Sequence, residues 1–369
     1  MTGGLIVIFG IIAMVMIHEG GHFVAAKAVG MKATEFFFGF GPKIWSTRRG
    51  ETEYGIKAIP LGGYVRIVGM NPYEEVDPAD FGRTYREQPF RAKAIVVLAG
   101  VASHFVVAFL LFLFVASVLG VSVSTTAVES VQTALENGTP TPASLVDIRP
   151  GDRVVSIDGV VTETWLQAVD LIAANPGESV AIVLDRSGTQ VTVNPTLASI
   201  EDDEGNDRGY LGVRSATVKD RAGPIEGIGD AGTAVGEATV ASATGLWRMV
   251  SGFGGLVEAV ISGDADKISE TRPASPIGLV RIGAETQELG LGFTLELVAL
   301  VNVFVGIFNV IPIYPLDGGH FAVALYEKVR GRPADVRKLA PVAAAVVIFM
   351  VLLGVLAIYL DIASPFSLQ

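Results

Sequence analysis

The sequence predicts a multi-span α-helical membrane protein with four transmembrane helices, a membrane-associated β-hairpin region and one α+β domain outside the cytoplasm. Half of the 369 residues are hydrophobic and only 18% are charged. The apolar residues gather into four runs, each long enough to cross a bilayer, which takes roughly 20 residues. A long acidic segment with strand-like alternation separates the second run from the third.

The first apolar run, Gly3 to Gly30, contains a metal-site motif. Its only formally charged residues are Glu19 and Lys27, and a charge at membrane depth costs from about 3 to more than about 10 kcal/mol. The motif His18-Glu-Gly-Gly-His22 places two imidazoles on one helical face, where both can bind the same ion. Glu19 is turned about 100° away, beside the ion, where it can take a proton from bound water. The motif therefore indicates a catalytic zinc site inside the membrane.

A catalytic zinc site needs a third protein ligand, and Asp317 is the best candidate. The sequence has no cysteine, which excludes disulfides and thiolate ligands and leaves His, Asp and Glu. Asp317 follows the third apolar run, just where Pro312 and Pro315 break the helix. Irregular backbone at membrane depth is tolerated where it lines a cavity, so we expect Asp317 to face the two histidines. The alternative is that Asp317 caps the helical segment that follows, through Arg330.

The two motifs together resemble the site-2 protease family of intramembrane zinc metalloproteases. The first matches His-Glu-x-x-His, and the second, from Asn309 to Gly318, matches Asn-x-x-Pro-x-x-x-Leu-Asp-Gly. The sequence is most similar to bacterial regulators of the RseP type, and among these to actinobacterial members with a single PDZ domain. The resemblance implies three ligands for Zn²⁺: His18, His22 and Asp317. It also implies that Glu19 is the general base and that Asn309 contacts substrate or stabilises the oxyanion.

Two positions of one motif depart from the family pattern, with valine in place of proline and histidine in place of asparagine. Family members often carry Gly-Pro-x-x-Asn early in the second span, whereas this chain has Gly100-Val-Ala-Ser-His104. His104 is a packing substitute for the asparagine, a proton carrier or an accessory metal contact. We favour the packing substitute.

Residues 31–93 connect the first two spans and predict a β-hairpin. Phe36 to Thr47 is aromatic and β-prone, Arg48-Arg49-Gly50 forms a turn, and Thr52 to Ile59 alternates like a strand. A charged turn between apolar arms favours a hairpin that dips into the membrane and offers a sheet edge to unfolded substrate. The resemblance implies a re-entrant hairpin here. An ordinary cytoplasmic β-turn region is the alternative.

Residues 124–200 predict the α+β domain. Arg149-Pro-Gly-Asp-x-Val-x-x-Ile-x-Gly resembles circularly permuted PDZ domains of bacterial proteases, and strands flank a helix at about Trp165 to Ala174. The length suits one PDZ domain, which the resemblance suggests acts as a size filter more than as a peptide receptor. Residues 201–289 then combine a linker with an amphipathic helix at Val240 to Ile261, expected on the outer membrane surface. Packing of that helix against the PDZ domain is the alternative.

The apolar runs set the remaining boundaries. We place the first transmembrane helix with the zinc motif at residues 1–30 and the second at 94–123. The third, with the aspartate motif and a cytoplasmic loop, occupies residues 290–340. The fourth, with the C-terminal tail, occupies residues 341–369.

Charge predicts the orientation in the plasma (inner) membrane, because Lys and Arg are enriched in cytoplasmic loops. Residues 30–93 hold ten Lys/Arg and eight Asp/Glu, and residues 314–340 hold five and three. Residues 120–290 hold eleven Lys/Arg and twenty-four Asp/Glu, a net charge of −13. We therefore expect the N-terminus and the PDZ domain outside and the zinc site towards the cytoplasm. The acidic exterior argues against nucleic acid as a partner.

These observations predict an intramembrane zinc metalloprotease that acts within the lipid bilayer on single-span membrane protein substrates. By resemblance, the substrates are proteins already trimmed outside, such as anti-sigma factors, or remnant signal peptides. One alternative is a non-proteolytic membrane receptor or adaptor with a structural zinc site, and another is a transporter. Glu19 argues against the receptor, since a structural zinc site needs no general base. The lack of repeated halves argues against most transporter folds.

Overall fold

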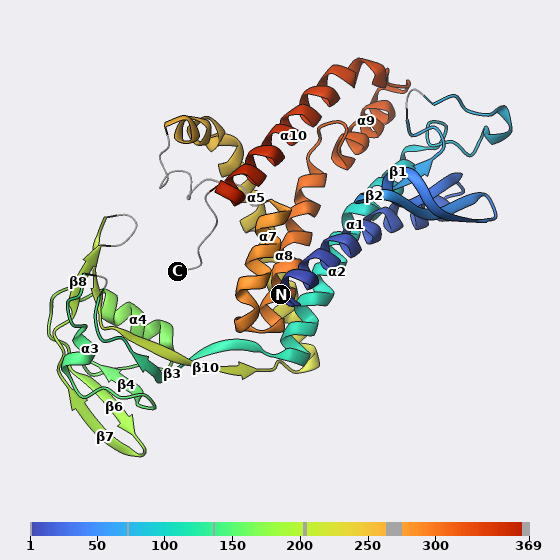
Figure 1. Ribbon diagram of the computed structural model, residues 1–369. Helices are drawn as coiled ribbons and strands as arrows, with labels where there is room; N and C mark the ends of the chain where they lie inside the picture. Colours follow the sequence, from blue (N-terminus) through green and yellow to red (C-terminus); the bar gives the residue numbers. More distant parts are fainter. Residues whose placement is uncertain (1, 72–73, 136, 202–204, 263–274, 364–369) are drawn as a thin grey trace. The chain divides into compact units, whose positions relative to one another are not determined.

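The computed structural model describes residues 2–71, 74–135, 137–201, 205–262 and 275–363 (Figure 1). The chain divides into two compact units. The first comprises Met1–Leu119 and Ala222–Gln369, and the second is Gly120–Arg221.

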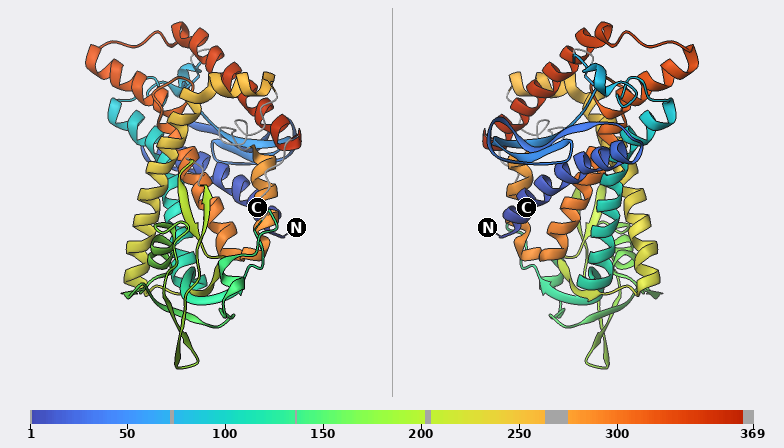
Figure 2. Two further views of the ribbon diagram at one scale, coloured as in Figure 1. Left: turned by 90° about the vertical axis from the view of Figure 1, so that its left-hand side faces the viewer. Right: turned by 90° about the vertical axis from the view of Figure 1, so that its right-hand side faces the viewer.

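Within the described residues, four helical segments of the first unit are long and apolar enough to cross a membrane. They are α1 (Thr2–Ala28), α2 (Phe90–Phe114) with the π-helical turn η2 (Val115–Leu119), α8 (Leu291–Val310) and α10 (Ala340–Ala363). Each coincides with one of the four apolar runs of the sequence. Helices α1, α2 and α8 lie side by side (Figures 1 and 2).

Small residues bring these helices close together. An added Cβ at Gly21 of α1 would lie 2.6 Å from the carbonyl oxygen of Ala99 in α2, and one at Gly10 would lie 2.8 Å from Val298 in α8. Such contacts drive helix association in lipid, where apolar surface gains nothing by leaving the solvent. The three helices therefore form a tight group whose spacing depends on the absence of side chains.

Shorter helices complete the first unit. They are α7 (Pro276–Glu285), η3 (Thr286–Leu289), α9 (Asp317–Arg330), η4 (Val336–Leu339) and, in the loop before α2, η1 (Pro78–Asp80). Helix α7 packs on α1, where an added Cβ at Gly4 would lie 3.1 Å from the Val280 carbonyl oxygen. The buried carboxylate of Asp361 in α10 accepts hydrogen bonds from the N–H groups of Ser275, at 2.8 Å, and Gly278, at 3.1 Å. These two bonds anchor the end of the fourth apolar helix to the start of α7.

Helix α5 (Pro224–Ser262) is much longer than the amphipathic segment expected at Val240 to Ile261. In its first half, Ala238 is buried in a cluster with Ala108 of α2 and with Ala299 and Val303 of α8. In its second half, Leu256 and Ala259 pack against Leu360 of α10. The first half thus lies against the helix group at the depth of the middle of α8, while a surface position for the second half stays a prediction.

The expected antiparallel pairing between the first two spans is present as β1 (Ala33–Arg49) and β2 (Thr52–Ile67). The beginning of β1 pairs on both sides, with Phe36 opposite both Tyr54 and Val65. The two long strands thus fold into four segments, and the end of β2 forms an outer edge. Glu51 at the turn pairs with Arg83 and with Lys27 of α1. The Arg83 guanidinium, with the Lys27 ammonium, lowers the pKa of Glu51 to about 2, so the turn is fixed at the end of α1.

The second unit is an α+β domain. Its six-stranded sheet has the order β10-β3-β4-β6-β7, with β5 paired to β4, and β8 and β9 form a separate pair. The strands are β3 (Val121–Val131), β4 (Arg153–Ile157), β5 (Val160–Val161), β6 (Ile182–Arg186), β7 (Thr189–Val193), β8 (Ala198–Glu201), β9 (Asp207–Tyr210) and β10 (Val213–Asp220). The helices are α3 (Pro142–Leu145) and α4 (Trp165–Ala173), the latter within one residue of its predicted span.

The second unit extends beyond the boundary that the sequence suggested at residue 200. Strand β10 returns to pair with β3, with Val213 opposite Val131. This pairing joins residues about eighty positions apart, which local pattern does not reveal. The apolar core lies between the sheet and α4 and includes Ile157, Ile182 and Leu184.

An ion pair between a buried carboxylate and a half-buried guanidinium joins the start of β4 to the end of β6. The carboxylate of Asp152, 2% exposed, accepts two hydrogen bonds of 2.8 Å from the Arg186 guanidinium. That guanidinium holds the pKa of the Asp152 carboxyl below its usual value. The charged carboxylate is thus favoured in the folded state, and the pair adds stability above the unfolded pKa of about 3.9.

We predict that Asp152→Asn destabilises this domain by about 2 kcal/mol at pH 7, because it weakens a charge-assisted pair. The depressed folded pKa means that the difference from wild type shrinks as the pH falls below about 4 and is lost once the pH lies below the pKa of the folded state. Hydrogen exchange of the β4 and β6 amides in the whole protein measures the effect. Asp170→Asn, at an exposed position on α4, is the control. Equal protection in wild type and Asp152→Asn at pH 7 would contradict the role of the pair.

Candidate active site

Helix α1 carries both motif histidines on the face that packs against α2. The Nδ1–H of His22 donates a hydrogen bond of 2.8 Å to the Val96 carbonyl in α2. Because Nδ1 holds the proton, Nε2 of the neutral ring presents its lone pair. An added Cβ at Gly100 would overlap the His22 ring, so this position of the imidazole requires glycine opposite it.

Asp317 lies close to the two histidines, although it is about 300 residues away in the sequence. Its Oδ2 lies 3.5 Å from Nε2 of His18 and 3.3 Å from Nε2 of His22, and the two Nε2 atoms are 3.2 Å apart. The alternative prediction, that Asp317 caps α9, does not describe its side chain. Asp317 is the first residue of α9, but Leu316 is the N-cap and no side-chain bond caps the helix.

These three residues fit a zinc ion. They form a group of His and Asp side chains in the described structure whose ligand atoms lie within 4.8 Å of one another. In a tetrahedral site with bonds of about 2.0 to 2.1 Å, neighbouring ligand atoms are about 3.3 Å apart, which agrees with the three separations of 3.2 to 3.5 Å. The Asp317 Oδ2 atom is also buried without a hydrogen-bond partner in the described structure, and a cation held by the three residues would satisfy it.

Glu19 lies beside this cluster and contacts the hairpin. Its Oε2 accepts a hydrogen bond of 3.0 Å from the N–H of Val65, at the outer edge of β2. An added Cβ at Gly63 would lie 3.8 Å from the Glu19 side chain and 2.7 Å from Met16. The strand edge therefore runs directly past the carboxylate that the motif singled out as a base.

The two asparagines of α8 occupy different surroundings. Asn302 is buried and lies 3.4 Å, Oδ1 to Nδ1, from His104 on α2. His104 in turn stacks on His18, so the face of α8 with Asn302 turns towards the site. Asn309 is half-buried two turns later, and its side chain forms no hydrogen bond with another described residue.

Several groups at the site have no signature in the sequence. The Val96 carbonyl and the Val65 N–H are backbone groups, which every residue supplies. Tyr85, from the loop before α2, has a buried hydroxyl without a hydrogen-bond partner in the described structure, and burial raises the pKa of this phenol, so it stays protonated. Its ring packs near His320 and under the Lys93 ammonium. No motif in the sequence distinguishes this tyrosine from the others.

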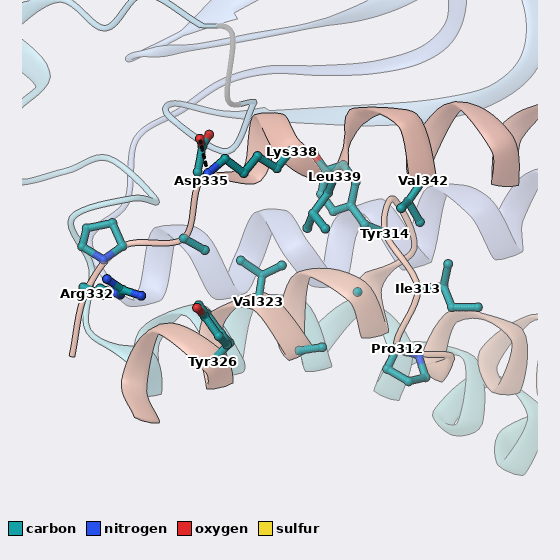
Figure 3. A pocket seen from close by; sticks show the side chains of 14 residues that line it. Pro312, Ile313, Tyr314, Val323, Tyr326, Arg332, Asp335, Lys338, Leu339 and Val342 are labelled. Carbon is teal, nitrogen blue, oxygen red and sulfur yellow. Dashed lines mark ion pairs between the residues drawn. The ribbon is translucent and has the colours of Figure 1, made fainter. Parts of the chain in front are cut away.

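A cavity of about 690 Å³ adjoins the aspartate motif (Figure 3). It lies between the Pro312–Tyr314 turn, α9 and the start of α10. Its wall includes Gly319, two residues beyond Asp317, and its rim includes Arg332 and the ion pair of Asp335 with Lys338 at 3.8 Å. An opening with charged residues thus reaches the backbone that carries the third candidate ligand.

Comparison with known proteins decides the family. The model of Peptidase family M50 matches residues 6–353, nearly the whole chain. The chain belongs to peptidase family M50. The match confirms the resemblance to site-2 proteases, and this M50 peptidase is accordingly a zinc metalloprotease.

Relatives with full-length similarity agree. Zinc metalloprotease Rip1 of Mycolicibacterium smegmatis is 34% identical over 409 residues, covering 100% of this chain and 99% of the relative. Rip1 of Mycobacterium tuberculosis is 32% identical, covering 100% and 98%. Zinc metalloprotease RasP of Geobacillus kaustophilus is 24% identical and covers 90% of both chains. Among solved structures, the PDZ domain of the SdrC-like protein of Listeria monocytogenes aligns at 23% identity and a TM-score of 0.21, covering 26% of this M50 peptidase and 92% of that chain.

The two glycines inside the histidine motif provide a matched test of this geometry. We predict that Gly21→Ala lowers the zinc content and reduces peptidase activity by more than about tenfold, because the methyl group forces α1 away from the Ala99 carbonyl. Gly20→Ala is the control, since an added Cβ there meets nothing within 4 Å, and alanine favours the helix. Metal analysis of the purified variants measures the effect. Equal zinc content in the two variants would contradict the tight α1–α2 contact.

Proposed function

We propose that this protein hydrolyses peptide bonds within the transmembrane segments of single-span membrane proteins. The observation that carries the proposal is a cluster of two histidines and one aspartate between helices that are apolar enough to cross a membrane. Ionisable groups at that depth are costly and are retained for function. Anti-sigma factors and remnant signal peptides are the substrate classes that the family resemblance favours.

In this proposal the protein lies in the plasma membrane with the N-terminus and a PDZ domain outside and the site towards the cytoplasm. The support is the distribution of charge, with a net of −13 over residues 120–290 and basic loops at 30–93 and 314–340. Two features support the PDZ assignment of the second unit. They are the Arg149-Pro-Gly-Asp152 pattern and the packing of helix α4 on an antiparallel sheet. A size filter outside would admit only substrates whose outer domain has been removed.

His18, His22 and Asp317 would hold the zinc ion, leaving one position for water and substrate. When bound, zinc supplies an activated water at neutral pH and polarises the scissile carbonyl. The Val96 carbonyl keeps the His22 ring in the tautomer and orientation that ligation requires. The Asp317 backbone follows the turn that ends α8 and begins α9, and α9 packs against α2 through a pair of phenylalanine rings, so the third ligand is held in place by that contact.

Glu19 would act as the general base. It takes a proton from the attacking water and passes it to the nitrogen of the leaving amine. The Val65 N–H, bonded to one of its oxygens, holds the carboxylate beside the cluster and leaves the second oxygen for the water. Asn309 would offer its amide N–H to the oxygen of the scissile carbonyl as negative charge develops there.

The outer edge of β2 would hold the substrate extended. Main-chain groups alternate in direction along a strand, so Gly63 presents its N–H and C=O to the same side as the Val65 N–H. A substrate segment that unwinds beside Glu19 could pair with this edge. Extension is needed because a helical peptide bond is enclosed in its own hydrogen-bond ladder. The polar-rimmed cavity near Gly319 (Figure 3) supports a route for water and for cleaved product.

We predict that Glu19→Gln abolishes cleavage of a model single-span substrate in proteoliposomes, by at least about a hundredfold, with unchanged zinc content. The isosteric amide cannot accept the proton, yet it is not one of the ligands. Added chelator should stop cleavage by the wild-type enzyme, and added zinc should restore it. Undiminished cleavage by Glu19→Gln would disprove the assigned mechanism. No cleavage by wild type of any single-span substrate would favour the adaptor alternative.

Asp317→Ala should lower the affinity for zinc by more than about a hundredfold, because one of three protein ligands is lost. Asp335→Ala is the matched control, since that carboxylate lies in the same region but pairs with Lys338. Metal titration of the two apo-variants gives the comparison. Equal affinities would show that the third ligand lies elsewhere.

A further inference from the structure

His104 has a ring nitrogen that the proposed mechanism does not use. The side chain is 2% exposed and lies face-on to His18, with ring centroids 4.7 Å apart and 30° between the planes. Its Nε2 is buried without a hydrogen-bond partner in the described structure. We propose that His104 Nε2 accepts a hydrogen bond from a main-chain N–H of the substrate beside the scissile bond. The inference rests on the proposed proteolytic function and makes His104 a substrate-binding residue.

The neighbouring asparagine decides which nitrogen carries the proton. The Nδ2 of Asn302 donates a hydrogen bond of 2.9 Å to the Val298 carbonyl, one turn back in α8. This bond orients the amide, so the atom facing His104 Nδ1 at 3.4 Å is the acceptor Oδ1. Nδ1 must then be the donor, and Nε2 of the neutral ring is left with a lone pair. The unpartnered atom is therefore an acceptor that needs a donor.

The position of His104 argues against two other roles, orienting the His18 ring and binding the metal ion. Contact with His18 is through the ring faces, so neither nitrogen of His104 orients that ligand. The described group of candidate metal ligands is His18, His22 and Asp317 and does not include His104. The ring is confined by its burial and by its stacking on His18, and α8 comes close to it, since an added Cβ at Gly306 would lie 3.1 Å from the His104 Cβ. A fixed, buried acceptor beside the cluster remains.

An extended substrate has two polar edges, and the hairpin supplies only one of them with partners. Strand β2 adjoins α1 at Met16 and Glu19, whereas α2 adjoins α1 at His18 and His22. A segment paired with β2 would thus turn its second edge towards α2. A main-chain N–H left without an acceptor at membrane depth is costly. His104 Nε2 is an acceptor on that side whose lone pair no described residue uses.

The test measures binding, separately from catalysis. Glu19→Gln protein in lipid nanodiscs is titrated with a fluorescent single-span peptide of leucine and alanine that has a central Gly-Ser step, first shown to be cleaved by wild type. We expect Glu19→Gln/His104→Phe to bind this peptide about tenfold more weakly. Phenylalanine keeps the ring stacked on His18 and removes only the nitrogens. Glu19→Gln/Ser103→Ala, whose hydroxyl bonds within α2, should bind like Glu19→Gln.

A backbone ester identifies the donor. Replacing one main-chain N–H of the peptide by oxygen, at each of the three bonds on either side of the cleavage site, should weaken binding to Glu19→Gln about tenfold at one position. At that position the same ester should have little effect on Glu19→Gln/His104→Phe. Asn302→Leu in the Glu19→Gln background should lose the same coupling, since it frees His104 to carry its proton on Nε2.

The possible results distinguish a failure of the His104 role from a failure of the proposed proteolytic function. Wild-type cleavage with equal binding by Glu19→Gln and Glu19→Gln/His104→Phe overturns the role of His104 and leaves the protease intact. Additive effects of ester and His104→Phe at every position overturn it as well. Lower zinc content in His104→Phe together with intact binding by His104→Gln would show that His104 only packs on His18. Absence of cleavage by wild type would instead reject the proposed function.

Discussion

The close contact between α1 and α2 is the constraint on which the rest of the site depends. Gly21 lies against the Ala99 carbonyl, and Gly100 lies against the ring of His22. In a membrane, helices associate through such close packing and through hydrogen bonds between helices. Here the same contact supplies both, because it brings the His22 Nδ1–H to the Val96 carbonyl. The orientation of a candidate metal ligand is therefore part of the packing of two apolar helices.

The other parts of the site are placed by breaks in regular structure. Helix α8 ends at Val310, and the turn that follows returns the chain so that α9 begins at Asp317. The hairpin bends on itself so that the end of β2, and not its turn, reaches Glu19. Both irregular segments lie against the helix group, which satisfies the rule that non-helical backbone at membrane depth is buried in protein or lines a cavity.

The sequence was sufficient for features that local pattern encodes. Apolar runs gave the four long helices, alternation around a charged turn gave the β1–β2 pairing, and the histidine and aspartate motifs gave the residues that converge. Pairing between distant segments was not encoded locally. Strand β10 completes a sheet begun at β3, and the first half of α5, which begins at Pro224, packs small residues such as Ala238 against α2 and α8. Those alanines carry no amphipathic signal, so the helix seemed to begin later.

At the site, the limits of prediction from the sequence have a different cause. Val96 and Val65 contribute a carbonyl and an N–H, and no residue type announces such a role. His104 was singled out only because it departs from a family motif, and a packing substitute was the favoured interpretation. Its environment adds what the motif lacked, namely an asparagine whose own hydrogen bond to Val298 fixes the direction of the amide. The tautomer of a buried histidine is a property of two neighbouring helices.

A protease that works inside a membrane must solve a problem that a soluble protease does not face. Unwinding a substrate helix exposes N–H and C=O groups that water would otherwise satisfy, and each unpaired group costs several kcal/mol in hydrocarbon. An enzyme that supplied only metal and base would have to overcome that cost at every bond it opened. In the proposed function, the strand edge beside Glu19 would offset it along one side of the substrate. Polar groups fixed between α2 and α8 would offset it along the other, so the walls of the site would lower the energy of the extended state before any bond is cleaved.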